Sequence, residues 1–398
     1  MFCNYCGAPN PEDAAFCYQC GKAVYRPPAS APAPEKVVPA VVPMPQPEAA
    51  ALAAPVPENS TGVISRDRPR TLTGHTLPID SLAFSPDGRW LASGSLDKTA
   101  KLWDVSDGRE VRTFTGNLPV TCVEFSPNGR QLVVAANNGS PRDGANFVAN
   151  SITLWDSARP DEVRNLVGHE GQLFFVKFSP DGHWLASTDG AATVNLWDIA
   201  SGQVVKVFKH GWLRAKLLGG DEGASLAFTP DGRFLASRSW PVTLWDLSSG
   251  KEARSFGPES PSLHVAMFIG FTPDGQSLVE ARASGKIRIW DAASGKEARC
   301  LADPPARSGV TSTLRCAALS SDGKFLAAAT YSSAETPKDK VTLWDIGAGR
   351  TLGTVTGDEF CDALAFSPDG QWLAIATIEY GGKEPLGKIK LWRTSEIR

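Results

Sequence analysis

One pattern recurs seven times along most of this 398-residue chain. A turn sequence of the Ser-Pro-Asp-Gly type, complete at residues 85–88, is followed each time by a Leu-Trp or Ile-Trp pair. Successive tryptophans of this pattern are 42 to 54 residues apart, at Trp103, Trp155, Trp197, Trp245, Trp290, Trp344 and Trp392. Self-similarity at such a period indicates an array of seven structural units.

Each unit contains short apolar segments that are rich in β-formers and bounded by Gly, Pro, Asp or Ser. In the first unit these segments are IDSLAF, WLASGS, AKLWDV and EVRTFT. Such segments predict four short strands per unit, and therefore an all-β fold.

The first unit reads GH, then FSPDG, then LASGSLDKTAKLWD across residues 74–104, and it resembles the WD40 family. The resemblance covers residues 69–398. It implies a seven-bladed β-propeller, in which each blade is a four-stranded antiparallel sheet beside a central channel.

The last unit lacks a strand. After each of the first six tryptophans, an apolar residue of the next strand follows 11 positions later, but only six residues follow Trp392. The segment 68–75 matches 109–117 and precedes the first complete unit. Because an unpaired strand edge leaves hydrogen bonds unmade, we expect the strand around 69–74 to complete the last blade. The propeller domain is predicted to span residues 63–398.

His75, Ser93 and Asp97 together suggest a nucleophilic triad. However, no G-x-S-x-G motif occurs, and Ser93 lies in a predicted strand. The resemblance to WD40 repeats implies instead that His75, Ser93, Asp97 and Trp103 form a buried structural hydrogen-bond network. The third unit matches with His169, Ser187 and Trp197, but we expect Ala191 in place of its aspartate.

Residues 27–62 contain ten prolines and nine alanines among 36 residues. Proline at this density removes backbone donors and fixes φ, so the stretch is predicted to be an extended, flexible linker.

Residues 1–26 contain two C-x-x-C pairs, formed by Cys3, Cys6, Cys17 and Cys20. Four thiolates suit one tetrahedral Zn²⁺ and leave no open coordination position, so the metal is predicted to be structural. The segment resembles a zinc ribbon. Two disulfides or a redox C-x-x-C are the alternatives, although neither a secretion signal nor a βαβ context supports them.

Charge and hydropathy favour some partners and compartments over others. The formal net charge is −3, and Glu12 and Asp13 balance Lys22 and Arg26 in the ribbon, so nucleic acid is an unfavoured partner. No apolar run approaches the roughly 18 residues of a membrane span. A basic segment leading into an apolar one is missing from the N-terminal region, which favours a cytoplasmic protein. The sequence does not predict the oligomeric state.

Loop lengths separate two faces of the expected propeller. From the Phe or Leu before the first turn to the Leu of the next strand, the spacing is seven in every unit, and the third turn is equally constant. Spacings across the second turn range from 10 to 23, and those into each new unit from 11 to 20. Long loops on a rigid frame are common binding sites. Candidate partner-binding residues in these variable connections are Phe147, Trp212, Arg214, Arg238, Trp240, Tyr331 and Tyr380.

These patterns predict a non-enzymatic scaffold that binds proteins or peptides on the variable-loop face, with the zinc ribbon as a second contact module. A propeller hydrolase with a site at the channel mouth is one alternative. Nucleic-acid binding through the ribbon is another.

Overall fold

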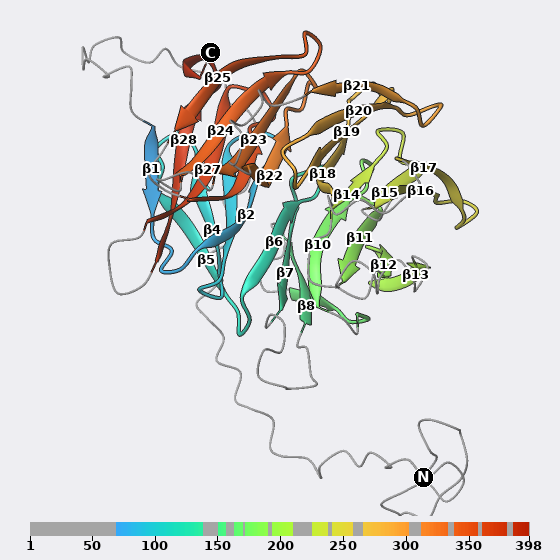
Figure 1. Cartoon of the computed structure of the whole chain (residues 1–398). Helices are drawn as coiled ribbons and strands as arrows, with labels where there is room; N and C mark the ends of the chain where they lie inside the picture. Colours follow the sequence, from blue (N-terminus) through green and yellow to red (C-terminus); the bar gives the residue numbers. More distant parts are fainter. Residues whose placement is uncertain are drawn as a thin grey trace, which may run out of the picture. The chain divides into compact units, whose positions relative to one another are not determined.

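The computed structural model describes the propeller strands and most of their turns (Figure 1). The described residues are 69–137, 150–156, 163–169, 172–189, 193–209, 225–237, 241–257, 266–301, 312–332, 338–356, 360–379 and 385–397. The predicted zinc ribbon (1–26) and linker (27–62) lie outside them, so these two boundaries stay predictions.

Seven four-stranded antiparallel sheets form the blades, which confirms the expected all-β, seven-bladed fold. The innermost, first strands are β2 (Ile79–Phe84), β6 (Val120–Phe125), β10 (Leu173–Phe178), β14 (Leu226–Phe228), β18 (Ala266–Phe271), β22 (Ser312–Leu319) and β26 (Phe360–Phe366). The second strands are β3 (Trp90–Ser95), β7 (Gln131–Asn137), β11 (Trp184–Asp189), β15 (Phe234–Ser237), β19 (Ser277–Arg282), β23 (Phe325–Ser332) and β27 (Trp372–Glu379).

The outer half of each blade contains the repeat tryptophan. The third strands are β4 (Thr99–Asp104), β8 (Asn150–Asp156), β12 (Thr193–Asp198), β16 (Val242–Asp246), β20 (Ile287–Asp291), β24 (Lys338–Asp345) and β28 (Leu386–Arg393). The fourth strands are β5 (Glu110–Thr115), β9 (Val163–Leu166), β13 (Gln203–Lys209), β17 (Glu252–Phe256), β21 (Glu297–Leu301), β25 (Arg350–Thr356) and β1 (Arg70–Thr73).

The strand β1 closes the ring as the fourth strand of blade 7, beside β28 (Figure 1). Leu72 pairs with Ile389 of β28, as Phe114 pairs with Ala100 in blade 1. The first strands of neighbouring blades touch around the whole ring, and β26 of blade 7 contacts β2 of blade 1. Both ends of the propeller chain therefore meet in one blade.

The first turn has one conformation in all seven blades, and its sequence explains why. In blade 1 the Gly88 N–H donates to the Ser85 carbonyl at 2.9 Å, and Gly88 has a φ of 71°. Only glycine adopts this left-handed conformation without strain. The Ser85 hydroxyl accepts the Trp90 N–H at 2.9 Å and contacts Asp87, which fixes the start of the second strand.

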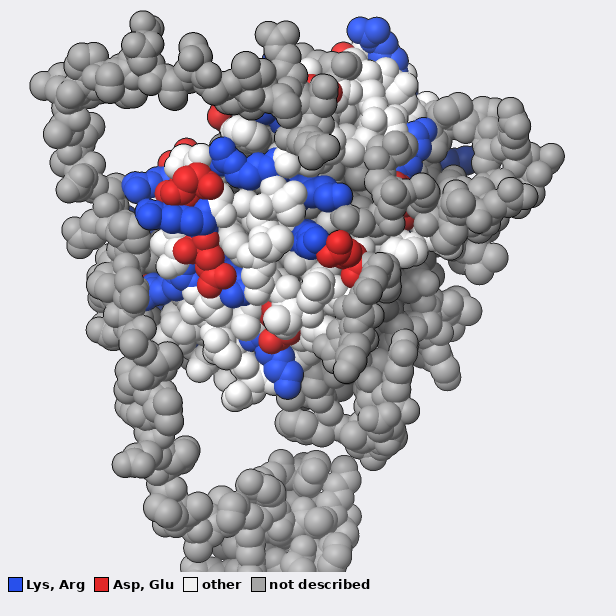
Figure 2. All heavy atoms as spheres, turned by 90° about the vertical axis from the view of Figure 1, so that its left-hand side faces the viewer, with Lys and Arg blue, Asp and Glu red and all other residues white. Residues whose placement is uncertain are grey.

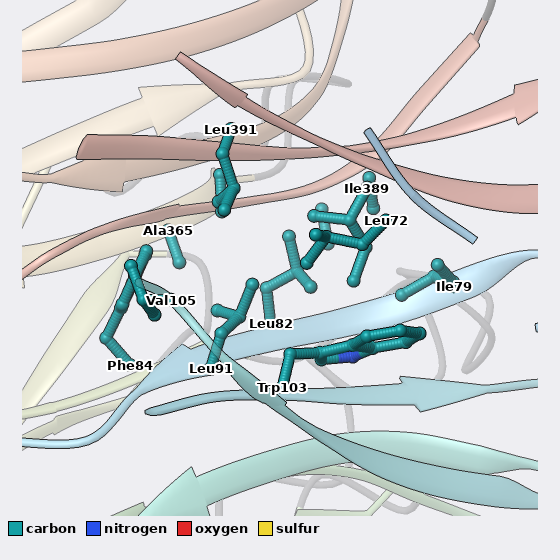
Figure 3. Close-up of a cluster of buried hydrophobic side chains, with 13 residues drawn as sticks. Leu72, Ile79, Leu82, Phe84, Leu91, Trp103, Val105, Ala365, Ile389 and Leu391 are labelled. Carbon is teal, nitrogen blue, oxygen red and sulfur yellow. The ribbon is translucent and has the colours of Figure 1, made fainter. Parts of the chain in front are cut away.

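Seven apolar clusters hold the ring together, and each joins two neighbouring blades. Figure 3 shows the cluster between blades 7 and 1, where Leu72 and Ile389 approach Ile79 and Trp103. Leu72 and Ile389 are 2% and 0% exposed. Burial of such side chains contributes about 1.5–3 kcal/mol each, so closure through β1 stabilises both blades that it joins.

A basic side chain of the fourth strand also latches most blades to the next one. Arg70 Nη1 donates to the carbonyls of Val105 and Ser106 at 2.6 and 2.8 Å. The equivalent contacts are made by Arg164, Lys206, Arg254 and Arg299. In blade 6 the equivalent residue is Gly353, which has no side chain to make this contact. The equivalence follows from strand pairing, since Gly353 pairs with Leu343 as Arg254 pairs with Leu244. There the 3₁₀ helix Thr394–Glu396 follows blade 7, and buried Ile397 packs into the joint cluster.

We call the end with the first and third turns the uniform face, and the end with the second turns and the connections between blades the variable face. Basic and acidic side chains are intermixed on the side of the propeller that carries β1 and β28 (Figure 2). This mixture agrees with the balanced charge of the sequence.

Candidate functional site

A chain of four side chains runs through blade 1. His75 Nδ1 lies 2.8 Å from Asp97 Oδ2, His75 Nε2 lies 2.7 Å from Ser93 Oγ, and Trp103 Nε1 donates to Ser93 Oγ at 2.8 Å. Because a carboxylate only accepts, the imidazole Nδ1–H donates to Asp97. Burial opposes ionisation of Asp97, but hydrogen bonds from His75 and Thr99 outweigh it and hold the pKa of Asp97 far below its usual range.

Burial excludes this Ser-His-Asp set from contact with a substrate. Ser93 is 0% exposed and His75 is 4% exposed, and the indole of Trp103 already donates to the hydroxyl. The network joins the segment before β2 to β3, to the second turn and to β4. The arrangement favours the structural role over nucleophilic catalysis.

Blade 3 contains a complete second network, which corrects one expectation from the sequence. His169 Nδ1 lies 3.1 Å from Asp189 Oδ2, and Ser187 Oγ contacts both His169 Nε2, at 2.6 Å, and Trp197 Nε1, at 2.7 Å. We expected Ala191 to leave this unit without its carboxylate. Asp189, the last residue of β11, supplies it instead, from a position two residues after the serine rather than four.

Other blades replace the serine. In blade 5 the Trp290 Nε1 donates to Glu280 Oε2 at 2.9 Å, and Arg282 Nε donates to Glu280 Oε1 at 2.9 Å. This ion pair is buried. In blade 7 the corresponding residue is Ile375, and the Trp392 N–H has no partner among the described residues.

A bulge residue near the start of the first strand points to a candidate binding site. The register of the first strand shifts in six blades, and the extra residues are Asp80, Thr121, Phe174, Met267, Arg315 and Asp362. All six are partly exposed. Because neighbouring blades cover both faces of these innermost strands, the exposed side is the one that borders the central channel. The six residues stand near the start of each strand, and therefore at the variable face. The charged ones lie on blades 6, 7 and 1, which are consecutive in the ring.

Arg315 is the centre of this charged group. Its Nη2 lies 2.5 Å from Asp362 Oδ1 on the next blade, and its Nε lies 3.7 Å from Asp339 Oδ2 on its own blade. The guanidinium also lies over the ring of Phe360, 5.3 Å from the centroid. Phe360 in turn stacks on Tyr331 with centroids 5.9 Å apart. We call Asp80, Arg315, Asp339 and Asp362 the mouth cluster.

The mouth cluster contains more carboxylates than cations. Burial, reinforced by the nearby charge of Asp362, raises the pKa of Asp80 to about 7. Burial also raises the pKa of Asp362 and of Asp339, even though Arg315 favours their ionised forms. Asp339 Oδ2 accepts the Cys361 N–H at 2.6 Å, whereas its buried Oδ1 has no partner among the described residues. The cluster can therefore accept a further hydrogen-bond donor or cation.

The four cysteines of the propeller occupy different environments. Cys122 and Cys361 are buried, as expected for small apolar residues, and Cys316 lies at the edge of the same core with its Sγ 3.6 Å from Cys361 Sγ. Cys300 is exposed on β21.

Comparison with known proteins places the fold in a family. The WD domain, G-beta repeat family matches residues 66–104, 108–142 and 160–198. The small ribosomal subunit protein RACK1 of Caenorhabditis elegans is 32% identical over 288 residues, which cover 59% of this chain and 82% of RACK1. The chain belongs to the WD40-repeat family.

The WD40 nuclear distribution protein PAC1 of Arthroderma otae is 28% identical over 324 residues, which cover 76% of this chain and 57% of PAC1. Protein tipD of Dictyostelium discoideum is 25% identical over 71% of this chain and 42% of its own length, so the chain spans about half of these longer relatives.

A second family, the zinc-ribbon domain, matches residues 2–24. Cys3, Cys6, Cys17 and Cys20 fall inside that match but outside the described residues. Within the described WD40 propeller, no group of three or more His, Cys, Asp or Glu side chains is arranged to hold a metal ion. No helix in that part of the chain is long and apolar enough to cross a bilayer.

The structure places one of the seven candidate partner-binding residues. Tyr331 lies near the end of β23, against Phe360, at the variable face of the WD40 propeller. The other six lie outside the described residues: Phe147, Trp212, Arg214, Arg238, Trp240 and Tyr380.

The mouth cluster was not predicted from the sequence, although a signal for most of it was present. Asp80, Arg315 and Asp362 each stand four residues before the Phe or Leu that precedes a first turn. The same position in the other WD40 repeats holds Thr121, Phe174, Ala224 and Met267. An alignment of the seven repeats on that residue would have shown three charges on consecutive blades.

Proposed function

We propose that this WD40 chain is a non-enzymatic scaffold that binds proteins or peptides on its variable face. The observation that carries the proposal is the mouth cluster, in which Asp339 and Asp362 share the cation Arg315 and the charge of Asp362 also acts on Asp80. A cationic group entering the cluster would relieve the repulsion between these carboxylates. The preferred partner therefore presents a lysine or arginine side chain to the channel mouth.

Apolar side chains complete the proposed surface. Phe174 and Met267 occupy the positions equivalent to Asp80 on blades 3 and 5. Arg315 lies over Phe360, which stacks on Tyr331. Aromatic residues beside charged ones are common among interface hot spots. The relatives support a binding role, because RACK1 is by its name a component of a larger assembly, the small ribosomal subunit.

Affinity capture with the full chain, followed by mass spectrometry, would identify the partner. With the purified partner, Asp80→Asn or Tyr331→Ala is expected to weaken binding about tenfold or more. Asp107→Ala and Lys324→Ala, on the exposed uniform face, serve as matched controls and are expected to change affinity less than twofold. Equal losses in both sets of variants would refute the proposed surface.

The pH dependence of partner binding gives an independent check. Ionisation of Asp80, whose pKa lies near 7, favours a cationic ligand, so affinity is expected to rise between pH 6 and pH 8. This dependence is expected to disappear in Asp80→Asn. If affinity for the partner falls over that range in the wild-type protein but not in Asp80→Asn, the proposed cationic contact is contradicted.

We also propose that Cys3, Cys6, Cys17 and Cys20 hold one structural Zn²⁺ in a cytoplasmic protein, and that the ribbon is a second protein-contact module. The zinc-ribbon match at residues 2–24 supports this assignment. The purified full chain is expected to contain one zinc per molecule by elemental analysis. Cys17→Ser is expected to lose it and the control Cys300→Ser to retain it. Less than about half an equivalent of zinc, with two disulfides by mass, would refute the site.

A further inference from the structure

The face of the propeller opposite the mouth cluster contains a cavity. A cavity of about 540 Å³ opens at the uniform face between blades 4 and 5. Its apolar floor consists of Phe234, Leu244 and Phe271, and its sides include Ala253 and Ala292. The volume falls in the range of about 300–1,000 Å³ that is usual for ligand pockets.

Small residues at two repeat positions explain why the cavity occurs here. The first position is two residues after the repeat tryptophan, where the other described blades with a third turn have a larger apolar residue in the joint between blades. Those residues are Val105, Ile199, Leu247 and Ile346. Blade 5 has Ala292. At the joint between blades 4 and 5, the larger side chain found in the other joints is therefore replaced by the methyl group of Ala292.

The second position is the residue skipped by the register shift in the fourth strand. Blades 1, 3 and 6 have Val111, Val205 and Leu352 there, whereas blade 4 has Ala253. Blade 5 also has alanine at this position, Ala298. The next joint, between blades 5 and 6, contains the larger Ile346 at the first position, so only one of its two positions is small. Ala253 and Ala292 both line the cavity at the joint between blades 4 and 5, and together they leave the space open.

The rim of the cavity carries a carboxylate that is available to a cation. Asp274 Oδ1 accepts from Thr272 Oγ1 at 2.6 Å and from the Gln276 N–H at 3.0 Å, and these bonds lower the pKa of Asp274. No salt bridge to Asp274 occurs among the described residues. The nearby Arg254 is already engaged, because its Nη1 donates to the Ala292 carbonyl and its charge acts on Asp291.

We propose that this cavity is a second docking site, and that it takes a large apolar side chain from a peptide segment of a partner in which a lysine or arginine is adjacent. The apolar side chain fills the space beside Ala253 and Ala292 over Phe234 and Phe271. The neighbouring cation pairs with Asp274 at the rim. The site is separate from the mouth cluster, which lies on the other face.

Capped dipeptides test the proposal on the full chain by ligand-observed saturation-transfer NMR. N-acetyl-Trp-Lys-amide is expected to bind saturably, N-acetyl-Trp-Glu-amide about threefold or more weakly, and N-acetyl-Ala-Lys-amide not measurably. The double variant Ala253→Val with Ala292→Ile fills the space with residues that occupy the same positions in other blades. It is expected to melt at or above the wild-type temperature and to lose binding of the Trp-Lys peptide about tenfold.

Asp274→Asn provides a second variant that leaves the core unchanged. It is expected to remove the preference for the Trp-Lys peptide over the Trp-Glu peptide while keeping the binding of both. Asp80→Asn, in the mouth cluster, is expected to bind the dipeptides as the wild type does, which separates this site from the variable face. Absence of saturable binding to the wild type, or equal binding to the filled double variant, would overturn the proposal.

Discussion

Asp80 combines burial with a like charge nearby, and the fold stabilises its neutral form. Because its pKa in the folded protein, about 7, lies above the value near 4 of an unfolded chain, the folded state binds the proton more tightly. The cost of ionising Asp80 is absent below about pH 4, grows as the pH rises, and is complete above about pH 7.

Asp80→Asn is therefore expected to stabilise the propeller increasingly as the pH rises above about 4, with the full gain above about pH 7. The gain in free energy of unfolding should be about 2 kcal/mol at pH 8, after allowance for partial exposure, and close to zero near pH 4. Urea denaturation of both proteins at the two pH values measures this difference. A gain of the same size at both pH values would mean that ionisation of Asp80 carries no cost.

The carboxylate of the blade 3 network gives a second residue-level prediction. Asp189→Ala removes an acceptor from His169 just as Asp97→Ala removes one from His75, so each should cost about 1.5–3 kcal/mol of stability. Ala191→Asp is expected to bring no gain, because the acceptor position is already occupied by Asp189. Thermal or urea unfolding of the three variants decides between Asp189 and residue 191 as the network position. A stabilising Ala191→Asp together with a neutral Asp189→Ala would contradict the assignment.

Sequence patterns predicted the residues of the one complete motif and missed residues that reach the same kind of contact from another position in the sequence. His75, Ser93, Asp97 and Trp103 were found because one complete copy of the motif is present. Asp189 was missed because a residue at the end of a strand can reach the same imidazole as a residue in the following turn. The pairing of Arg315 with Asp362 across two blades depends on a bulge, and no local pattern in the chain specifies a bulge.

At the level of elements, the strand β1 is expected to be important for stability, because it pairs with β28 and its Arg70 bonds to the third turn of blade 1. We call this bond from the fourth strand to the next blade the latch. Deleting residues 63–74 removes β1, opens the edge of β28 and takes Leu72 out of the joint core. Deleting residues 1–62 leaves all of these contacts in place. The shorter deletion is therefore expected to lower the melting temperature by roughly 10 °C or more, and the longer one by little. Equal melting temperatures for the two truncations would show that β1 is not needed for closure.

The strands could be predicted because Ser-Pro-Asp-Gly turns and tryptophans mark their ends. The position of β1 could be predicted as well, since counting strands left one blade incomplete. The latch from Arg70 to the third turn of blade 1 could not, because it joins residues 35 and 36 positions apart through backbone carbonyls. The cavity between blades 4 and 5 was equally hidden, because an alanine shows its effect only when the facing residue is also small.

On the scale of the whole molecule, the ring presents two different faces. The uniform face is built from first turns of one length and conformation, and its proposed cavity results from two alanines rather than from a long loop. The variable face contains the mouth cluster and the connections whose lengths differ from blade to blade. A rigid ring of this kind can hold one partner at the mouth cluster while a second segment docks elsewhere, which is the behaviour expected of a scaffold.

Site-specific photo-crosslinking tests the variable face most directly. A benzophenone amino acid is placed at Tyr331 in one protein, and at Asp107 or Lys324 on the uniform face in two others, away from the cavity. Each full chain is irradiated with the captured partner, and the adducts are quantified by mass spectrometry. Adducts from position 331, with few from 107 and 324, are the predicted result. Adducts from 107 or 324 and none from 331 would contradict the assignment of the variable face as the binding surface.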